Sequence, residues 1–151
     1  MTDTTAPTDL RAPVRLDDRD LIALVEQVAN GDPHAVIPAG DSRRWGLAYA
    51  TPDVEVWVIE WPPGSGLEMH DHDDSTAAVR VIDGRLRERY VYDGDVIMRW
   101  LGGRTFVLPR DHVHEVINTE TIPAVSIHAY SPPIAEMSFR DDPAFDVTKP
   151  E

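Results

Sequence analysis

Histidine is the residue type on which metal chemistry in this chain would depend. The sequence has six histidines and no cysteine, so thiolate ligands and disulfides are excluded and a metal site must use His, Asp and Glu. His70 and His72 are two residues apart, so on a strand both imidazoles point to the same face, as a chelating pair requires. The spacing alone is also compatible with a solvated turn, because the pair lies in the acidic segment MHDHDDS.

A second set of polar residues alternates along the segment SIHAYSPP. On a strand, Ser126, His128 and Tyr130 would all face one way. Inside a barrel their polar groups would be costly without partners, which predicts a hydrogen-bonded chain of serine, histidine and tyrosine. Two interpretations remain open, a network that serves a metal cavity and one that only satisfies the barrel interior.

The elements that must position these residues are mostly short strands. One helix is expected over residues 17–30, where apolar residues recur at helical spacing between Asp17 as N-cap and Gly31 just past the end. From about Trp45 onward, short alternating or apolar runs are typical of an antiparallel sandwich or barrel. The expected strands are WGLAYAT, VEVWVIEW, AAVRVIDG, RLRERYVYDG, RTFVLP, HEVINT and AVSIHAYS, with turn signals at PPGSG, both DG pairs and GG.

Length and charge restrict the partners. With 151 residues and 42% hydrophobic content, the chain can form one domain with a core, expected over residues 13–140 between polar tails at 1–12 and 141–151. A net charge of -13 opposes binding to nucleic acid or anionic membranes. No apolar run approaches the roughly 20 residues that cross a bilayer, and the N-terminus lacks signal-peptide features. A cytoplasmic protein is expected.

The segment around the histidine pair resembles the first motif of the cupin superfamily. Gly64, five residues, His70-x-His72 and a later Gly84 have the spacing of that motif. The glutamate ligand of the common motif falls at Ala77, which cannot bind a metal. The resemblance therefore implies a site built from histidines alone.

A later segment closely resembles the second cupin motif. Gly103, five residues, Pro109, four residues, His114, three residues and Asn118 have its spacing. The resemblance implies an all-β cupin, a small jelly-roll-like β-barrel with a short N-terminal helix, in which His114 is the third ligand. His112 is the competing choice, but the spacing of the motif favours His114. Three neutral imidazoles leave half of an octahedral coordination sphere open, which suits Fe(2+) in redox chemistry but would also hold zinc.

The segments HDHDDS and AVSIHAYSPP, within roughly residues 44–133, resemble the cysteine dioxygenase type I family and its thiol dioxygenase relatives. The resemblance implies Fe(2+) held by three histidines and conversion of a thiol to a sulfinic acid with both atoms of O2. It also implies that Ser126, His128 and Tyr130 are the outer-sphere triad, with the tyrosine hydroxyl near the reacting groups. Because Ala77 stands where animal members have the cysteine that is linked to this tyrosine, Tyr130 is expected to be unmodified, as in bacterial members.

One arginine is expected to recognise the substrate. The resemblance implies that Arg44 grips the carboxylate of cysteine, for which the forked guanidinium is well suited. The neighbouring Arg43 would take this role if the alignment slipped by one residue. Members that prefer 3-mercaptopropionate usually carry glutamine there, so arginine favours cysteine.

The sequence thus predicts a bacterial-type cysteine dioxygenase that converts L-cysteine and O2 to cysteine sulfinic acid. Two alternatives stay open: a dioxygenase of 3-mercaptopropionate or another small thiol carboxylate, and a metal-binding cupin without catalysis. The expected partners are the small thiol and O2, in a monomer or a small homo-oligomer.

Overall fold

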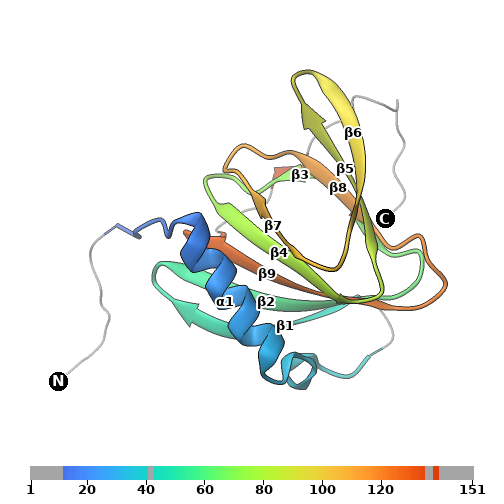
Figure 1. The fold of residues 1–151 in the computed structure, drawn as a ribbon, viewed down its shortest axis with the longest axis horizontal. Helices are drawn as coiled ribbons and strands as arrows, with labels where there is room; N and C mark the ends of the chain where they lie inside the picture. Colours follow the sequence, from blue (N-terminus) through green and yellow to red (C-terminus); the bar gives the residue numbers. More distant parts are fainter. Residues whose placement is uncertain (1–11, 41–42, 135–137, 140–151) are drawn as a thin grey trace.

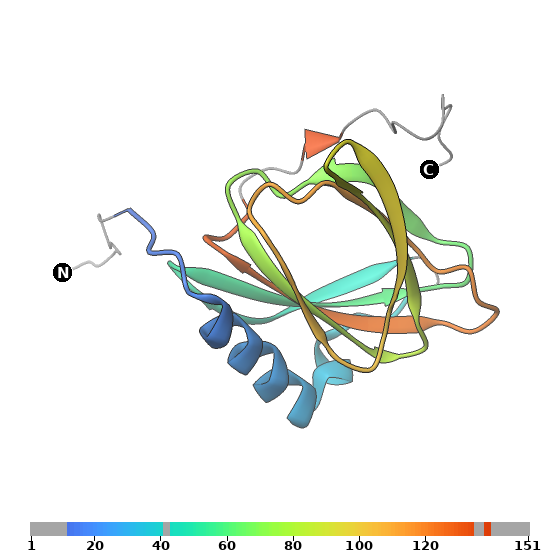
Figure 2. The same ribbon diagram turned by 45° about the horizontal axis from the view of Figure 1, so that its top comes forward.

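Two antiparallel sheets form the body of the structure, a computed structural model that describes residues 12–40, 43–134 and 138–139. One sheet has the strand order β1-β2-β9-β4-β7 and the other β10-β3-β8-β5-β6. The sheets face each other as a barrel, with the helix on the outside (Figures 1 and 2), so the all-β prediction is confirmed. The elements are α1 (Asp18–Asn30), the 3-10 turn η2 (Pro33–Val36), β1 (Arg44–Thr51), β2 (Val54–Trp61), β3 (Gly66–Asp71), β4 (Thr76–Asp83), β5 (Leu86–Tyr92), β6 (Asp95–Leu101), β7 (Thr105–Leu108), β8 (His114–Ile117), β9 (Ala124–Ser131) and β10 (Ser138–Phe139).

The helix α1 covers the outer face of the first sheet. It begins after Asp17, whose side chain accepts a hydrogen bond from the backbone N–H of Asp20 at 2.9 Å, which confirms the predicted N-cap. Leu21 and Val25 are fully buried in the apolar cluster between helix and sheet. The helix therefore shields the apolar side chains on the outer face of this sheet from solvent.

Strand β9 lies at the centre of that sheet, between β2 and β4, and all eight of its residues are buried. Its outward residues, Val125, Ile127 and Ala129, join the cluster under α1. Because side chains alternate along a strand, the residues between them point into the barrel. This strand therefore carries the polar triad on its inner face, and its backbone is paired with a neighbouring strand on each side.

The hairpin between β5 and β6 forms at the predicted DG turn. Asp93 and Gly94 have positive φ angles of 52° and 83°, and Tyr92 pairs with Asp95 across them. Two such residues form the two-residue turn that matches strand twist. Strand β6 itself was missing from the predicted strands, because this mostly exposed edge strand has no regular apolar alternation to reveal it.

The predicted tails, residues 1–12 and 141–151, lie outside the described residues except for Ala12, and the single domain over 13–140 stays a prediction. Within the described part of the chain, every helix is too short or too polar to span a membrane.

A candidate metal centre inside the barrel

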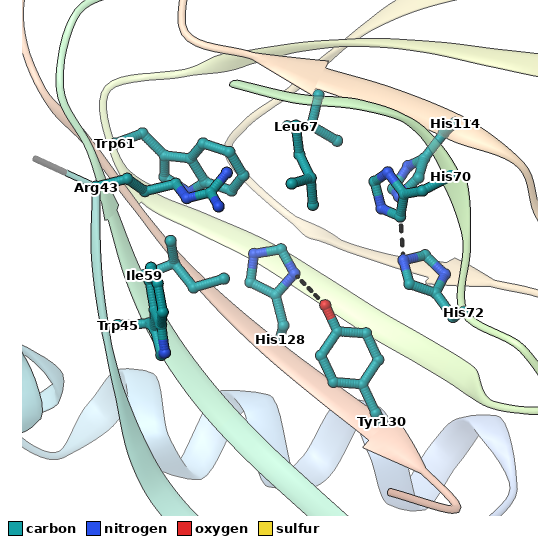
Figure 3. Close-up of a pocket in the computed structure, with 11 residues that line it drawn as sticks. Arg43, Trp45, Ile59, Trp61, Leu67, His70, His72, His114, His128 and Tyr130 are labelled. Carbon is teal, nitrogen blue, oxygen red and sulfur yellow. Dashed lines mark hydrogen bonds between the residues drawn. The ribbon is translucent and has the colours of Figure 1, made fainter. Parts of the chain in front are cut away.

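Three histidines from two neighbouring strands meet inside the barrel (Figure 3). His70 lies in β3, His72 follows one residue after its end, and His114 begins β8, where it pairs directly with His70. Their ring centroids are 4.6 to 5.0 Å apart, and all three side chains are buried, at 1 to 2% exposure. The structure therefore brings together the three predicted ligands, and HxH is not a solvated turn.

The nitrogen atoms of these rings fit a metal ion. The Nε2 atoms of His72 and His114 are 3.2 Å apart, close to the roughly 3 Å expected for adjacent imidazoles with bonds of about 2.1 Å to one ion. Nδ1 of His70 donates to the carbonyl oxygen of Glu68 at 2.6 Å, so its Nε2 carries a lone pair. The buried Nδ1 of His72 has no hydrogen-bond partner among the described residues, which leaves the tautomer of that ring unfixed.

Burial keeps the three imidazoles neutral. It lowers the pKa of His70 from 6.5 to about 3, helped by repulsion from His114. It also lowers the pKa values of His72 and His114, where neighbouring histidines contribute in the same direction. Neutral imidazole is the form that binds a metal. The donor set and its protonation state therefore both fit a divalent ion.

His112, the competing third ligand, does not point at the other two. Its Nε2 is 2.7 Å from Oε2 of Glu88, and the same carboxylate oxygen is 2.6 Å from Nδ1 of His114. Glu88 is fully buried. Sequence reasoning missed this glutamate, although its place in RLRERYVY, two residues from the buried Leu86, was a signal of a charge on the inner face of β5.

The triad on β9 forms a continuous hydrogen-bonded chain. Oγ of Ser126 is 2.7 Å from Nε2 of His128, and Nδ1 of His128 is 3.2 Å from the hydroxyl of Tyr130. The chain begins at Trp61, whose Nε1 donates to Oγ of Ser126 at 2.8 Å.

The indole gives the chain a direction. An indole N–H can only donate, so Ser126 accepts from Trp61, and its hydroxyl can then either donate to Nε2 of His128 or accept from it. Burial lowers the pKa of His128 to about 3, so the ring is neutral and carries a single proton, which lies on Nδ1 when Ser126 donates to Nε2. In that arrangement the ring proton points to the oxygen of Tyr130, and the phenol proton can donate into the cavity.

The structure places Arg43 at the cavity and the predicted Arg44 away from it. Arg44 lies on the outer face of β1, where it donates to the carbonyl oxygen of Pro38 at 2.7 Å and pairs with Glu60. Arg43 lines the cavity instead, with its guanidinium 5.3 Å from the ring centre of Trp61. The reason is strand alternation: Arg43 shares a side with Trp45, which also lines the cavity, and Arg44 does not.

The cavity around these groups has a volume of about 300 Å³, at the lower end of the range for small-molecule sites. Burial lowers the pKa of Arg43 and raises that of Tyr130. The cavity is lined by Arg43, Trp45, Ile59, Trp61, Leu67, His70, His72, His114, Val116, His128 and Tyr130 (Figure 3). One cation and one phenol thus face the three histidines across otherwise apolar and aromatic walls.

Solved structures with the same fold include oxalate oxidase, with a TM-score of 0.57 and 20% identity over 68% of this chain and 59% of that one. This chain thus spans less than two thirds of that protein. A Klebsiella pneumoniae protein with a double-stranded β-helix domain has a TM-score of 0.58 and 20% identity, covering 72% and 93%. The cupin domain of Schizosaccharomyces pombe Cnp3 has a TM-score of 0.54 and 11% identity, covering 65% and 70%. These likenesses establish the cupin fold.

The sequence itself matches the family model for cysteine dioxygenase type I over residues 41–142. This range takes in the three histidines, both arginines and the whole triad. The match and the histidine cluster together indicate a metal-dependent, dioxygenase-like cupin. Since the match covers more than half of the 151 residues, the chain belongs to the cysteine dioxygenase type I family.

Proposed function

We propose that this chain is an iron(II) thiol dioxygenase that converts L-cysteine and O2 to cysteine sulfinic acid. One observation carries the proposal: a cluster of three neutral imidazoles shares a small cavity with Arg43 and Tyr130. The reaction balances without a further reductant, because both oxygen atoms end on the sulfur, which loses the electrons that O2 gains. When bound by the three histidines, ferrous iron would supply open coordination positions and the one-electron chemistry that O2 requires.

Arg43 is the group that would hold the substrate carboxylate. Its guanidinium lies between the rings of Trp45 and Trp61, at 5.6 and 5.3 Å, and donates through one nitrogen to the carbonyl oxygen of Gly66 at 3.0 Å. A guanidinium has five N–H donors, so others are left for a carboxylate. The aromatic walls and the backbone contact fix the fork, which reduces the entropy lost when the substrate binds.

Tyr130 would act as a donor and not as a base. Burial raises the pKa of its phenol, so the hydroxyl keeps its proton at neutral pH. With Ser126 as the donor to His128, the hydrogen-bonded chain from Trp61 would leave this proton free to point at the reacting sulfur and oxygen. The triad therefore orients one hydrogen bond toward the place where charge develops.

The cavity leaves the amine of the substrate without a protein partner. None of the described lining residues carries a carboxylate that could pair with an ammonium group. Cysteine would therefore be distinguished from 3-mercaptopropionate only if its amine took a coordination position on the metal. This observation favours the deaminated thiol acid as the second candidate substrate.

The deciding experiment uses the protein purified with Fe(II). We expect O2 uptake matched by sulfinate when L-cysteine is supplied, and none when Zn(II) replaces Fe(II), because zinc has no redox chemistry. Faster turnover of 3-mercaptopropionate than of cysteine would mean that the deaminated thiol is the preferred substrate of the same reaction. Iron binding without O2 uptake from either thiol would reject catalysis in favour of a metal-binding cupin.

Replacing each arginine separately tests which one recognises the carboxylate. For Arg43→Gln we expect KM for cysteine to rise about 10- to 100-fold, because the variant loses a charge-assisted hydrogen bond worth about 1.5–3 kcal/mol. Arg44→Gln is the matched control and should change KM little, because Arg44 faces Pro38 and Glu60 outside the cavity. Kinetics at equal iron content check this, and the opposite ranking would restore Arg44 to the role.

Removing the phenol should separate turnover from metal binding. Tyr130→Phe is expected to lower kcat about 100-fold with iron content unchanged, because one oriented donor is lost. His114→Ala should instead lose the metal. Tyr49→Phe removes a hydroxyl on the exposed part of β1 and should do neither. Iron assays that showed metal loss in Tyr130→Phe and retention in His114→Ala would reject both roles.

Acid should destabilise the metal-free protein through its buried histidines. His70 and His128 have folded-state pKa values of about 3, below the ordinary 6.5, so the unfolded chain binds more protons below that pH. Stability is therefore full above pH 6.5 and is lost as the pH falls toward 3, by up to about 1.4 kcal/mol per pH unit for each imidazole. Urea denaturation should show this slope, with a shallower one in His128→Gln; a free energy of unfolding that stayed constant down to pH 4 would contradict it.

A further inference from the structure

A buried carboxylate stands directly behind the third histidine. Glu88 points inward from β5, which pairs with β8, and its side chain is fully buried. Oε2 lies 2.6 Å from Nδ1 of His114 and 2.7 Å from Nε2 of His112, while Oε1 accepts from Nε of Arg99. His114 therefore lies between the cavity on one side and a carboxylate on the other.

The environment keeps this carboxylate ionised. Oε1 forms an ion pair with Nε of Arg99, and Oε2 lies within hydrogen-bond distance of a ring nitrogen of both His112 and His114. Arg99 adds a positive charge, and its guanidinium is kept in place 4.6 Å from the ring centre of Tyr90 and 4.8 Å from that of Phe106. A buried charge is stable only with such partners.

An ionised carboxylate decides where the proton of His114 lies. It has no hydrogen to donate, so the contact with Nδ1 forms only when that nitrogen carries the proton. The lone pair is then on Nε2, the atom that faces His72 at 3.2 Å. The negative charge behind the ring also makes Nε2 a stronger donor to a metal.

We propose that Glu88 is a positioning residue that presets His114 for metal binding, and that it sets the affinity and reduction potential of the centre. The inference rests on the metal centre of the proposed function but not on the thiol substrate. His112 and Arg99 hold the carboxylate from its remaining sides, so neither needs to touch the metal. A purely structural role, in which Glu88 only neutralises Arg99, predicts no effect on the metal itself.

The substitution that tests the proposal is Glu88→Gln. A glutamine can accept from the histidines only by turning its NH2 toward Arg99, where two donors would meet. In the other orientation its NH2 faces Nδ1 of His114, which places the proton on Nε2 and blocks the metal. Either way the preset tautomer is lost. We expect affinity for Co(II) and Zn(II), measured by competition with a chromophoric chelator, to fall about 10- to 100-fold.

Glu115→Gln is the matched control. Glu115 is the residue after His114 and is partly buried, but its carboxylate pairs with Arg89 at 2.8 Å and belongs neither to the cluster of His70, His72 and His114 nor to that of Glu88, His112 and His114. The Glu115→Gln substitution removes the same charge from β8, the strand that carries His114 and pairs with β5. We expect wild-type metal affinity in this variant and a raised Fe(III)/Fe(II) potential only in Glu88→Gln, an effect that a structural role would not produce.

A measurement on the unaltered chain covers the case in which Glu88→Gln fails to fold. Nitrogen-15 NMR of the metal-free protein should show His114 protonated at Nδ1, and protonation at Nε2 would overturn the proposal. Equal metal affinities in the two glutamine variants would also overturn it while leaving the metal centre intact. A wild-type chain that bound no metal would instead reject the centre and the proposed function together.

Discussion

The site depends on the convergence of three neutral imidazoles in the buried interior of the barrel. Nε2 of His114 faces Nε2 of His72 at 3.2 Å, and lone pairs at that distance repel unless a proton or a cation lies between them. Burial prevents the rings from relieving this repulsion by becoming charged. Acceptors behind the rings of His70 and His114 hold the arrangement in place, and a metal ion is the partner that would satisfy it.

The barrel supplies the rigidity that such an arrangement requires. Strand β9 packs against α1 with one face and presents the triad with the other, so movement of Ser126, His128 or Tyr130 would disturb both layers. Strands β3 and β8 are neighbours in one sheet, and their pairing places His70 directly opposite His114. The polar groups of the site therefore sit on regular strands, where hydrogen bonding to neighbouring strands limits their freedom.

The polar interior is organised as two chains of hydrogen bonds that end in the same cavity. One chain runs from Trp61 to Tyr130 and ends at the phenol hydroxyl. The other runs from Arg99 through Glu88 to His114 and leaves the lone pair of that ring on Nε2. Each begins at a group that can only donate, an indole or a guanidinium, and this fixes the direction of the first hydrogen bond in each chain.

The sequence by itself determined the fold class, the helix with its Asp17 cap, the three histidines and the triad, because these rest on local periodicity and on motif spacing. Only the tertiary structure decided between Arg43 and Arg44, since the choice depends on which side of β1 faces the cavity. It also revealed Glu88, which is 26 residues from His114 in sequence and meets it only through the pairing of β5 with β8. Spacing along a chain encodes which side chains share a strand face, whereas contacts between strands depend on register, and register exists only after the sheets have formed.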